Sequence, residues 1–270
     1  MTELHLGINV GHDRAAAVVA DGAVLVAIEE ERRARQVDAK EITMKNVTLL
    51  IGLAMLTLGS SVATQEKPPL PTEVVELIEK AKAGDAVAQA LLAKRYVSGK
   101  GVTKDDKEAV KWWRKAAEQN NARAQYCLGF MYDTGRGVLE DDKEAVKWYR
   151  KAADQGYAAA QFELGVMYAN GEGVPEDDKE AVKWYRKAAE QGDAKAQSNL
   201  GLMYSAGRGV LEDVVMAYAW YNIAGANGNS IARENKSKLA KRMTKEQMAE
   251  SQKLSRKLYD EIEKRKSKGN

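Results

Sequence analysis

The sequence predicts an all-α protein built as an α/α solenoid that ends in a long capping helix. Residues 73–232 repeat with a period of 36, which is typical of helix pairs stacked in a row. Alanines and large apolar residues recur at helical spacing inside each copy. The register is kept by one glutamine and one tryptophan in every repeat: Gln89, Gln125, Gln161 and Gln197, and Trp112, Trp148, Trp184 and Trp220.

The first helix of each repeat, helix A, is represented by residues 158–171. Ala160 and Leu164 fall on one face at helical spacing, together with the methionine and tyrosine that follow. Gly171 and Gly173 are expected to end the helix, because glycine adopts the left-handed cap at low steric cost.

The second helix, helix B, is represented by residues 178–192. Asp177 and Glu180 have the spacing of a capping box, in which each side chain binds the backbone N–H of the other residue. Ala181 and Trp184 begin an apolar stripe that one helix pair cannot hide alone. Stacking the pairs buries it, and each large side chain then contributes about 1.5–3 kcal/mol.

Both ends of the solenoid look like caps. The stretch after Pro71 resembles a reduced helix B, and the stretch after Trp220 resembles a degenerate further unit. A second capping box, Thr244 to Gln247, then opens a long polar helix. We therefore place the solenoid at residues 72–232, and the capping helix with its basic tail at 233–270.

The segment "AQFELGVMYANGEGVPEDDKEAVKWYRKAAEQGD" and its three siblings resemble the Sel-one-like repeat family, a relative of the tetratricopeptide repeats. The resemblance covers about 160 residues of the chain. It implies a right-handed α/α solenoid of about four repeats. It also implies a non-catalytic scaffold or adaptor that binds proteins, with neither a cofactor nor a metal.

Residues 44–63 have the layout of a signal peptide: a basic start at Met44-Lys45, an apolar run, and small residues up to Ala63. Cleavage there would leave a periplasmic or secreted protein with no stable membrane span, and residues 64–71 as a linker. A buried hydrophobic helix is the alternative interpretation. If translation starts at Met1 and the signal is not used, the protein would be cytoplasmic.

Residues 1–36 contain "LGINVGHD", "DGAVLVA" and "EEERRAR", which resemble the start of carbamoyltransferases of the nodulation and antibiotic-tailoring type. That resemblance implies a short β-hairpin and an ATP-dependent activity. It stops near Gln36, so we expect an inactive fragment of such an enzyme, joined through a linker at 37–43. A functional fusion is the alternative hypothesis.

The charge is uneven. Residues 233–270 contain 13 Lys or Arg and 6 Asp or Glu, so this tail carries 13 − 6 = +7 while the whole chain carries +3. The charge therefore does not indicate a nucleic-acid-binding protein as a whole. A second functional alternative is an envelope-associated protein whose tail binds an anionic envelope polymer. A solvated helix end is the simpler interpretation, since cations suit that end of the helix dipole.

Three features could suggest chemistry, and each has a simpler structural interpretation. The Gly-x-Gly loops recur at a fixed period, which indicates turns rather than phosphate sites. The Asp-Asp pairs, such as Asp177 and Asp178, stand at helix starts, where a carboxylate caps free N–H groups. Cys127 has no histidine in the repeats to activate it. We therefore predict no catalytic, metal or cofactor residues.

A contrast between repeat positions gives the candidate binding surface. Some helix A positions barely change between copies, whereas others differ in every copy and lie three or four residues apart on one side of the helix. The resemblance implies that this side lines a concave groove, where variable positions can be shaped to a protein or peptide partner. The predicted groove residues are Arg123, Tyr126, Phe130, Asp133, Phe162, Val166, Asn170, Lys195, Ser198 and Leu202.

Overall fold

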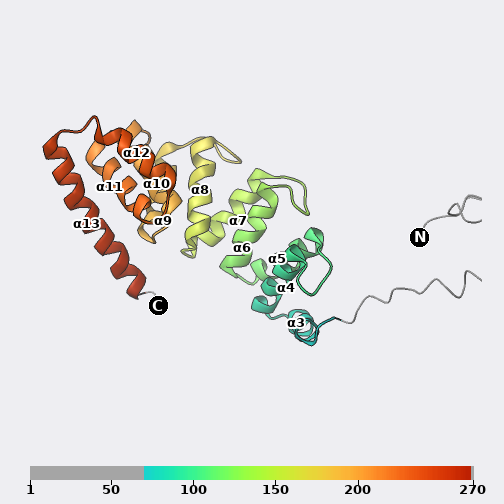
Figure 1. The fold of residues 1–270 in the computed structure, drawn as a ribbon. Coiled ribbons are helices and arrows are strands. Elements are labelled where there is room, and N and C mark those ends of the chain that lie inside the picture. Colours follow the sequence, from blue (N-terminus) through green and yellow to red (C-terminus); the bar gives the residue numbers. More distant parts are fainter. Residues whose placement is uncertain (1–69, 269–270) are drawn as a thin grey trace, which may run out of the picture. The chain divides into compact units, whose positions relative to one another are not determined.

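The computed structural model describes residues 70–268, and every regular element within them is an α-helix (Figure 1). The predicted signal peptide and the carbamoyltransferase-like segment lie outside the described residues. The helices, labelled as in Figure 1, are α3 (Thr72–Lys82), α4 (Ala86–Ser98), α5 (Asp106–Glu118), α6 (Ala122–Asp133), α7 (Asp142–Asp154), α8 (Ala158–Asn170), α9 (Asp178–Glu190), α10 (Ala194–Ala206), α11 (Val214–Ala226), α12 (Ser230–Ala240) and α13 (Lys245–Lys268).

The helices form the predicted stack of pairs. Helices α4, α6, α8 and α10 are the four helices A, and α5, α7, α9 and α11 are the helices B that follow them. From α3 to α12, each helix packs mainly against the one before it and the one after it. The all-α solenoid predicted from the 36-residue period is confirmed. None of the described helices combines the length and the apolar character that a membrane span needs.

The helix A ends follow the predicted glycine signals. α8 ends at Asn170, and Gly171 then takes φ of 73°, in the left-handed region where a side chain is strained. Gly171 N–H donates to the Met167 carbonyl, which closes the helix. The next glycine, Gly173, is needed for a different reason. A Cβ there would lie 2.3 Å from the Asp142 carbonyl oxygen, so the loop could not approach the preceding helix B with a side chain present.

The start of α9 confirms one direction of the predicted capping box, the bonds accepted by the aspartate. The Asp177 carboxylate accepts hydrogen bonds from Lys179 N at 2.9 Å and Glu180 N at 3.0 Å. The return bond from Glu180 to Asp177 N–H was a wrong prediction, because that N–H donates to the Tyr168 carbonyl at 2.9 Å. Glu180 instead pairs with Lys183 on the next turn of the helix.

The core is built from the repeated small and large positions. Ala160, Leu164 and Met167 of α8 are buried. So are Ala188 and Ala189 of α9, together with Trp184 on the same helix. Glycines inside the helices A let the two helices of a pair approach closely. A Cβ on Gly165 would lie 2.7 Å from the Tyr185 ring, which explains why this position holds no side chain.

The buried glutamines explain why their position never changes. Gln161 is 4% exposed, and its Nε2 donates to the Ala153 carbonyl of the preceding helix B at 3.0 Å. Its Oε1 accepts from Gln191 Nε2 of the following helix B at 2.7 Å. One buried amide thus joins three helices and satisfies its own polar atoms. The same arrangement recurs at Gln89, Gln125 and Gln197.

The loops between paired helices also carry an ion pair that the sequence did not indicate. Arg136 binds both carboxylate oxygens of Asp106, at 3.0 and 3.1 Å, across 30 residues of sequence. Arg208 binds Asp178 in the equivalent place, at 2.7 and 3.0 Å. The second aspartate of these pairs therefore connects neighbouring repeats, while the first one caps the helix.

Both ends are closed by modified units. α3 takes the place of a helix B, since its Ala81 carbonyl accepts from Gln89 Nε2 at 3.0 Å. At the other end α13 packs along α11, with Ile262 buried against it. The Thr244–Gln247 capping box at the start of α13 is confirmed in both directions, at 2.9 and 3.2 Å.

Candidate functional site

The predicted groove residues lie on the helices A, on the side that we call the helix A face. It is defined by the predicted positions of α6, α8 and α10. Phe130 and Leu202 expose 37% and 47% of their surface. Tyr126, Asp133, Phe162 and Val166 are half-buried, and Arg123, Asn170 and Lys195 are exposed.

Ser198 does not fit the predicted set. It is only 7% exposed, so a partner could touch little of it. Side-chain size does not explain this, because the smaller Ala90 at the equivalent position of the first repeat is half-buried, as are Tyr126 and Phe162.

The aromatic side chains of this face pack against other aromatic rings of the fold. The Tyr126 ring lies 5.7 Å from the ring of the buried Tyr149 and 5.2 Å from that of Tyr157. In the repeat that follows, the Phe162 ring lies 6.0 Å from the Tyr185 ring. Because their inner edges pack against the core, these rings lose little freedom when a partner covers their outer edges.

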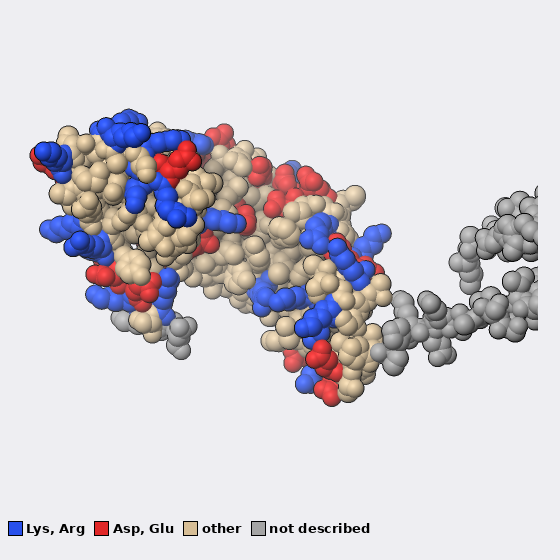
Figure 2. All heavy atoms as spheres, viewed as in Figure 1, with Lys and Arg blue, Asp and Glu red and all other residues tan. Residues whose placement is uncertain are grey.

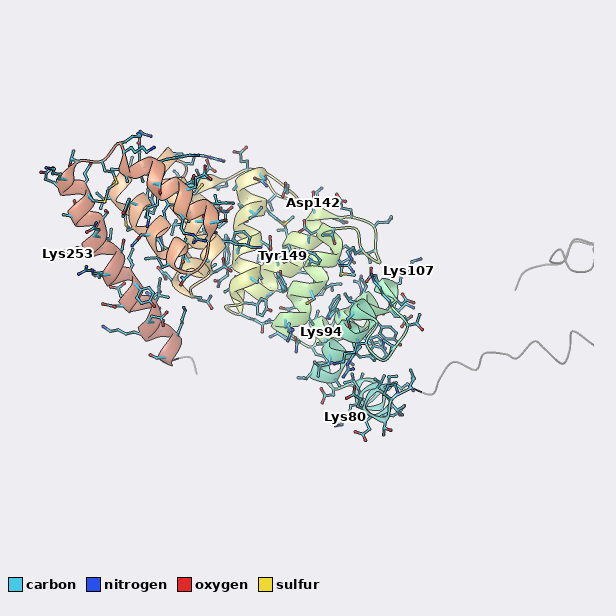
Figure 3. The ribbon with its side chains drawn as sticks, viewed as in Figure 1. Lys80, Lys94, Lys107, Asp142, Tyr149 and Lys253 are labelled. Carbon is cyan, nitrogen blue, oxygen red and sulfur yellow. The ribbon has the colours of Figure 1, made fainter. Side chains whose placement is uncertain are left out.

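Two half-buried carboxyl groups stand on neighbouring helices A, Asp133 on α6 and Glu163 on α8. Tyr149, labelled in Figure 3, donates its hydroxyl hydrogen bond to Asp133 Oδ2 at 3.1 Å. Burial, together with the smaller effect of the negative charge of Asp133, raises the pKa of Glu163 to about 7. Burial also raises the pKa of Asp133, whereas the hydrogen bond from Tyr149 lowers it. Sequence analysis had selected Asp133 but missed Glu163, whose variable position was the only available signal.

Two cations of the predicted face act on different neighbours. Lys195 lies over the Phe162 ring, with Nζ 5.7 Å from the ring centroid, and its charge lowers the pKa of Glu163. Arg123 acts on Cys127, where its charge lowers a thiol pKa that burial raises.

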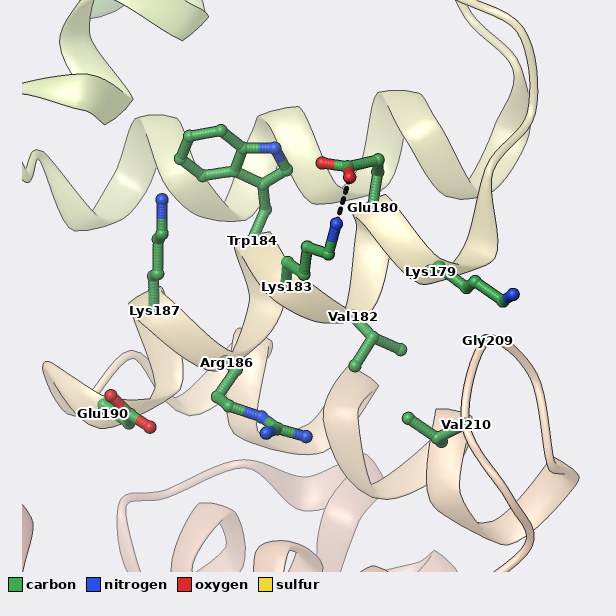
Figure 4. A pocket seen from close by; sticks show the side chains of 10 residues that line it. All are labelled: Lys179, Glu180, Val182, Lys183, Trp184, Arg186, Lys187, Glu190, Gly209 and Val210. Atoms are coloured by element: carbon green, nitrogen blue, oxygen red, sulfur yellow. Dashed lines mark hydrogen bonds and ion pairs between the residues drawn. The ribbon is translucent and has the colours of Figure 1, made fainter.

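A hollow of about 530 Å³ lies elsewhere, on the outer side of α9 (Figure 4). Its charged side chains, apart from Lys179, have partners within the fold. Lys183 pairs with Glu180, Lys187 lies 3.9 Å from the Trp184 ring centroid, and Arg186 donates to the Tyr204 hydroxyl at 2.6 Å. We therefore interpret these side chains as stabilising the fold and do not treat the hollow as a binding site. It is lined by Lys179, Glu180, Val182, Lys183, Trp184, Arg186, Lys187, Glu190, Gly209 and Val210.

The other chemical candidates have structural roles. Cys127 is half-buried and packs against the core, and burial raises its pKa to about 11, which keeps the thiol protonated. Within residues 70–268, no three His, Cys, Asp or Glu side chains are grouped so that they could hold a metal ion.

Charged side chains of both signs are spread over the visible face of the molecule, with two local concentrations (Figure 2). Lysines and arginines gather where α11, α12 and α13 close the stack, and acidic side chains gather over the loop before α7. Part of the basic tail serves the fold, since Arg265 pairs with Glu190 of α9 at 2.5 Å.

The stacked helix pairs define an α/α solenoid of 36-residue repeats. The Sel1 repeat matches four consecutive segments, residues 86–121, 122–157, 158–193 and 194–229. These 4 × 36 = 144 residues are 53% of the 270-residue chain. The chain therefore belongs to the Sel1 repeat family.

Two solved structures are similar to this chain. A Sel1 repeat protein from Oxalobacter formigenes is 34% identical, with a TM-score of 0.59, over 70% of this chain and 74% of that one. The protective antigen c5321 from uropathogenic Escherichia coli, which displays an SLR fold, is 33% identical with a TM-score of 0.49. That match covers 70% of this chain and 48% of the antigen. No curated protein matches the chain significantly.

Proposed function

We propose that this chain is a non-catalytic scaffold that binds a protein or peptide segment on its helix A face. The observation that carries the proposal is the contrast between fixed and variable positions. Glutamine, glycine and alanine positions are fixed because packing within and between the repeats requires them. The positions facing outward on the helices A change in every copy, yet they include exposed apolar side chains such as Phe130 and Leu202.

Energetics supports this choice of surface. Burying one exposed apolar side chain against a partner contributes about 1.5–3 kcal/mol. Several such anchors on a rigid stack of helices give specific binding without large ordering costs, because the backbone is already fixed.

The test replaces exposed apolar side chains of this face by aspartate. We expect Phe130→Asp with Leu202→Asp to abolish recovery of partner proteins from a host extract. Leu139 and Leu211 provide the matched control, because both are 90% exposed and lie on loops outside this face. Leu139→Asp with Leu211→Asp should recover the same partners as the unmodified chain. Equal loss in both variants would refute the assignment of the face.

Export belongs to the same proposal. It rests on the signal-like residues 44–63 of the sequence. Fractionating the native host and sequencing the N-terminus of the mature protein tests it. We expect a start at or near Thr64 in the periplasm or the medium, whereas a start at Met1 in the cytosol would contradict export.

A further inference from the structure

Helix α12 carries cations where the repeats carry core residues. It takes the place of a fifth helix A, yet Lys236 stands at the position of the buried Leu200, and Arg233 at that of the buried Gln197. In the described part of the chain, α13 does not cover α12 as a helix B would. It packs along α11 instead, and its Arg265 reaches back to pair with α9. The stack therefore ends in a helix with an exposed, basic side.

The excess of positive charge continues into the turn after α12. Residues 233–245 contain six Lys or Arg and one acidic residue, Glu234, which already pairs with Lys238 at 2.6 Å. The other five cations make no ion pair within residues 70–268. All of them are exposed except Lys236, which is half-buried and donates to Asn222 Oδ1 at 3.1 Å. We call these five residues the basic end: Arg233, Lys236, Lys241, Arg242 and Lys245.

Closing the stack does not require this charge. A terminal cap needs only a polar outer side, which mixed charges also provide. Cations that crowd together repel one another, and this repulsion costs stability unless a counter-charge is present. Lysines on the helices B show the balanced alternative, since each is neutralised within one turn: Lys111 by Glu108, Lys147 by Glu144, and Lys183 by Glu180. Figure 2 shows the resulting concentration of positive charge where α12 and α13 close the stack.

We propose that the basic end binds the surface of a membrane that contains anionic phospholipids. None of its five residues lines the hollow on α9, so the cations are spread over an outer surface instead of surrounding that cavity. A spread of exposed cations suits a flat surface with many phosphate groups, because each cation then meets negative charge independently. These residues are not part of the helix A face, so the inference goes beyond the scaffold function and does not depend on it.

The experiment measures sedimentation of the full chain with lipid vesicles, made of phosphatidylcholine alone or mixed with phosphatidylglycerol. We expect a strong preference for the mixed vesicles in 0.1 M salt. The preference should disappear in 1 M salt, where the Debye length shortens from about 10 Å to about 3 Å. Each cation at an anionic surface strengthens binding about fivefold. Lys241→Gln with Arg242→Gln and Lys245→Gln should therefore weaken binding about 100-fold.

The matched control removes the same charge elsewhere. Lys107→Gln with Lys143→Gln and Lys179→Gln changes exposed lysines at the starts of α5, α7 and α9. It should bind within about threefold of the unmodified chain, because charges beyond a Debye length from the lipid are screened. The apolar residues 44–63 are the same in all three proteins and cannot cause a difference between them. Circular dichroism confirms that each variant is folded.

Two results would overturn the inference directly: equal weakening in the variant and the control, or equal binding to both kinds of vesicle. Tighter binding to soluble polyphosphate than to the mixed vesicles would also overturn it, in favour of an acidic polymer as the ligand of the basic end. In each case the helix A face would remain a separate question, decided by its own variants.

Discussion

Replacing Gln161 with alanine should destabilise the centre of the solenoid by about 2–4 kcal/mol. The side chain is buried and makes two hydrogen bonds, to the Ala153 carbonyl at 3.0 Å and from Gln191 Nε2 at 2.7 Å. Each bond contributes about 1 kcal/mol net. The substitution also leaves the buried Ala153 carbonyl without this donor and opens a small cavity, and these two effects account for the remainder.

Urea unfolding followed by circular dichroism measures this loss. The control is Gln191→Ala, which removes the 2.7 Å bond from its exposed end, where water can replace the lost partner. That variant should lose only about 0.5–1 kcal/mol. If Gln161→Ala and Gln191→Ala are equally destabilised, the buried amide does not connect the repeats as described, and the explanation of its fixed position is refuted.

Three further predictions concern packing, protonation and charge. Gly165→Ala should destabilise the protein by about 1–3 kcal/mol in the same assay, since its Cβ would lie 2.7 Å from the Tyr185 ring; an unchanged midpoint would contradict this. Burial raises the pKa of Glu163 from 4.5 to about 7, so its contribution to stability falls as pH rises through that window. Glu163→Gln should therefore be more stable than the unmodified chain at pH 8, by about 1–2 kcal/mol after allowance for solvent screening. At pH 4 the difference should be small, because the glutamate and the glutamine are then both neutral. A larger stabilisation at pH 4 than at pH 8 would contradict this prediction. Glu172 stands at the position that Arg136 and Arg208 occupy in the other loops, so Glu172→Arg should give Asp142 an ion-pair partner and raise stability by up to about 1 kcal/mol. A loss of stability in this variant would argue against the contribution of the loop ion pairs.

The sequence predicted the fold well because its signals are local. The ends of α8 and α9 follow from Gly171 and Asp177, whose conformational and capping preferences act within a few residues. The stacking follows from the 36-residue period, since an apolar stripe repeated at a fixed interval must meet its neighbour.

Contacts between repeats were less predictable. The Arg136–Asp106 pair spans 30 residues, and nothing in either loop alone indicates it. The same holds for Glu163, because a variable position shows freedom from packing but does not show which neighbouring side chain it meets. Ser198 failed for a related reason: its exposure depends on the neighbours that cover its particular repeat, since the equivalent Ala90, Tyr126 and Phe162 are only half-buried.

The most direct test of the account asks which surface a natural partner touches. A photoreactive amino acid placed at Phe130 or Leu202 should cross-link a partner protein in the native host upon illumination. The same residue at Leu139 or Leu211, on the exposed loops, should not. Cross-links from the loop positions alone would contradict the central claim that the helix A face is the binding surface.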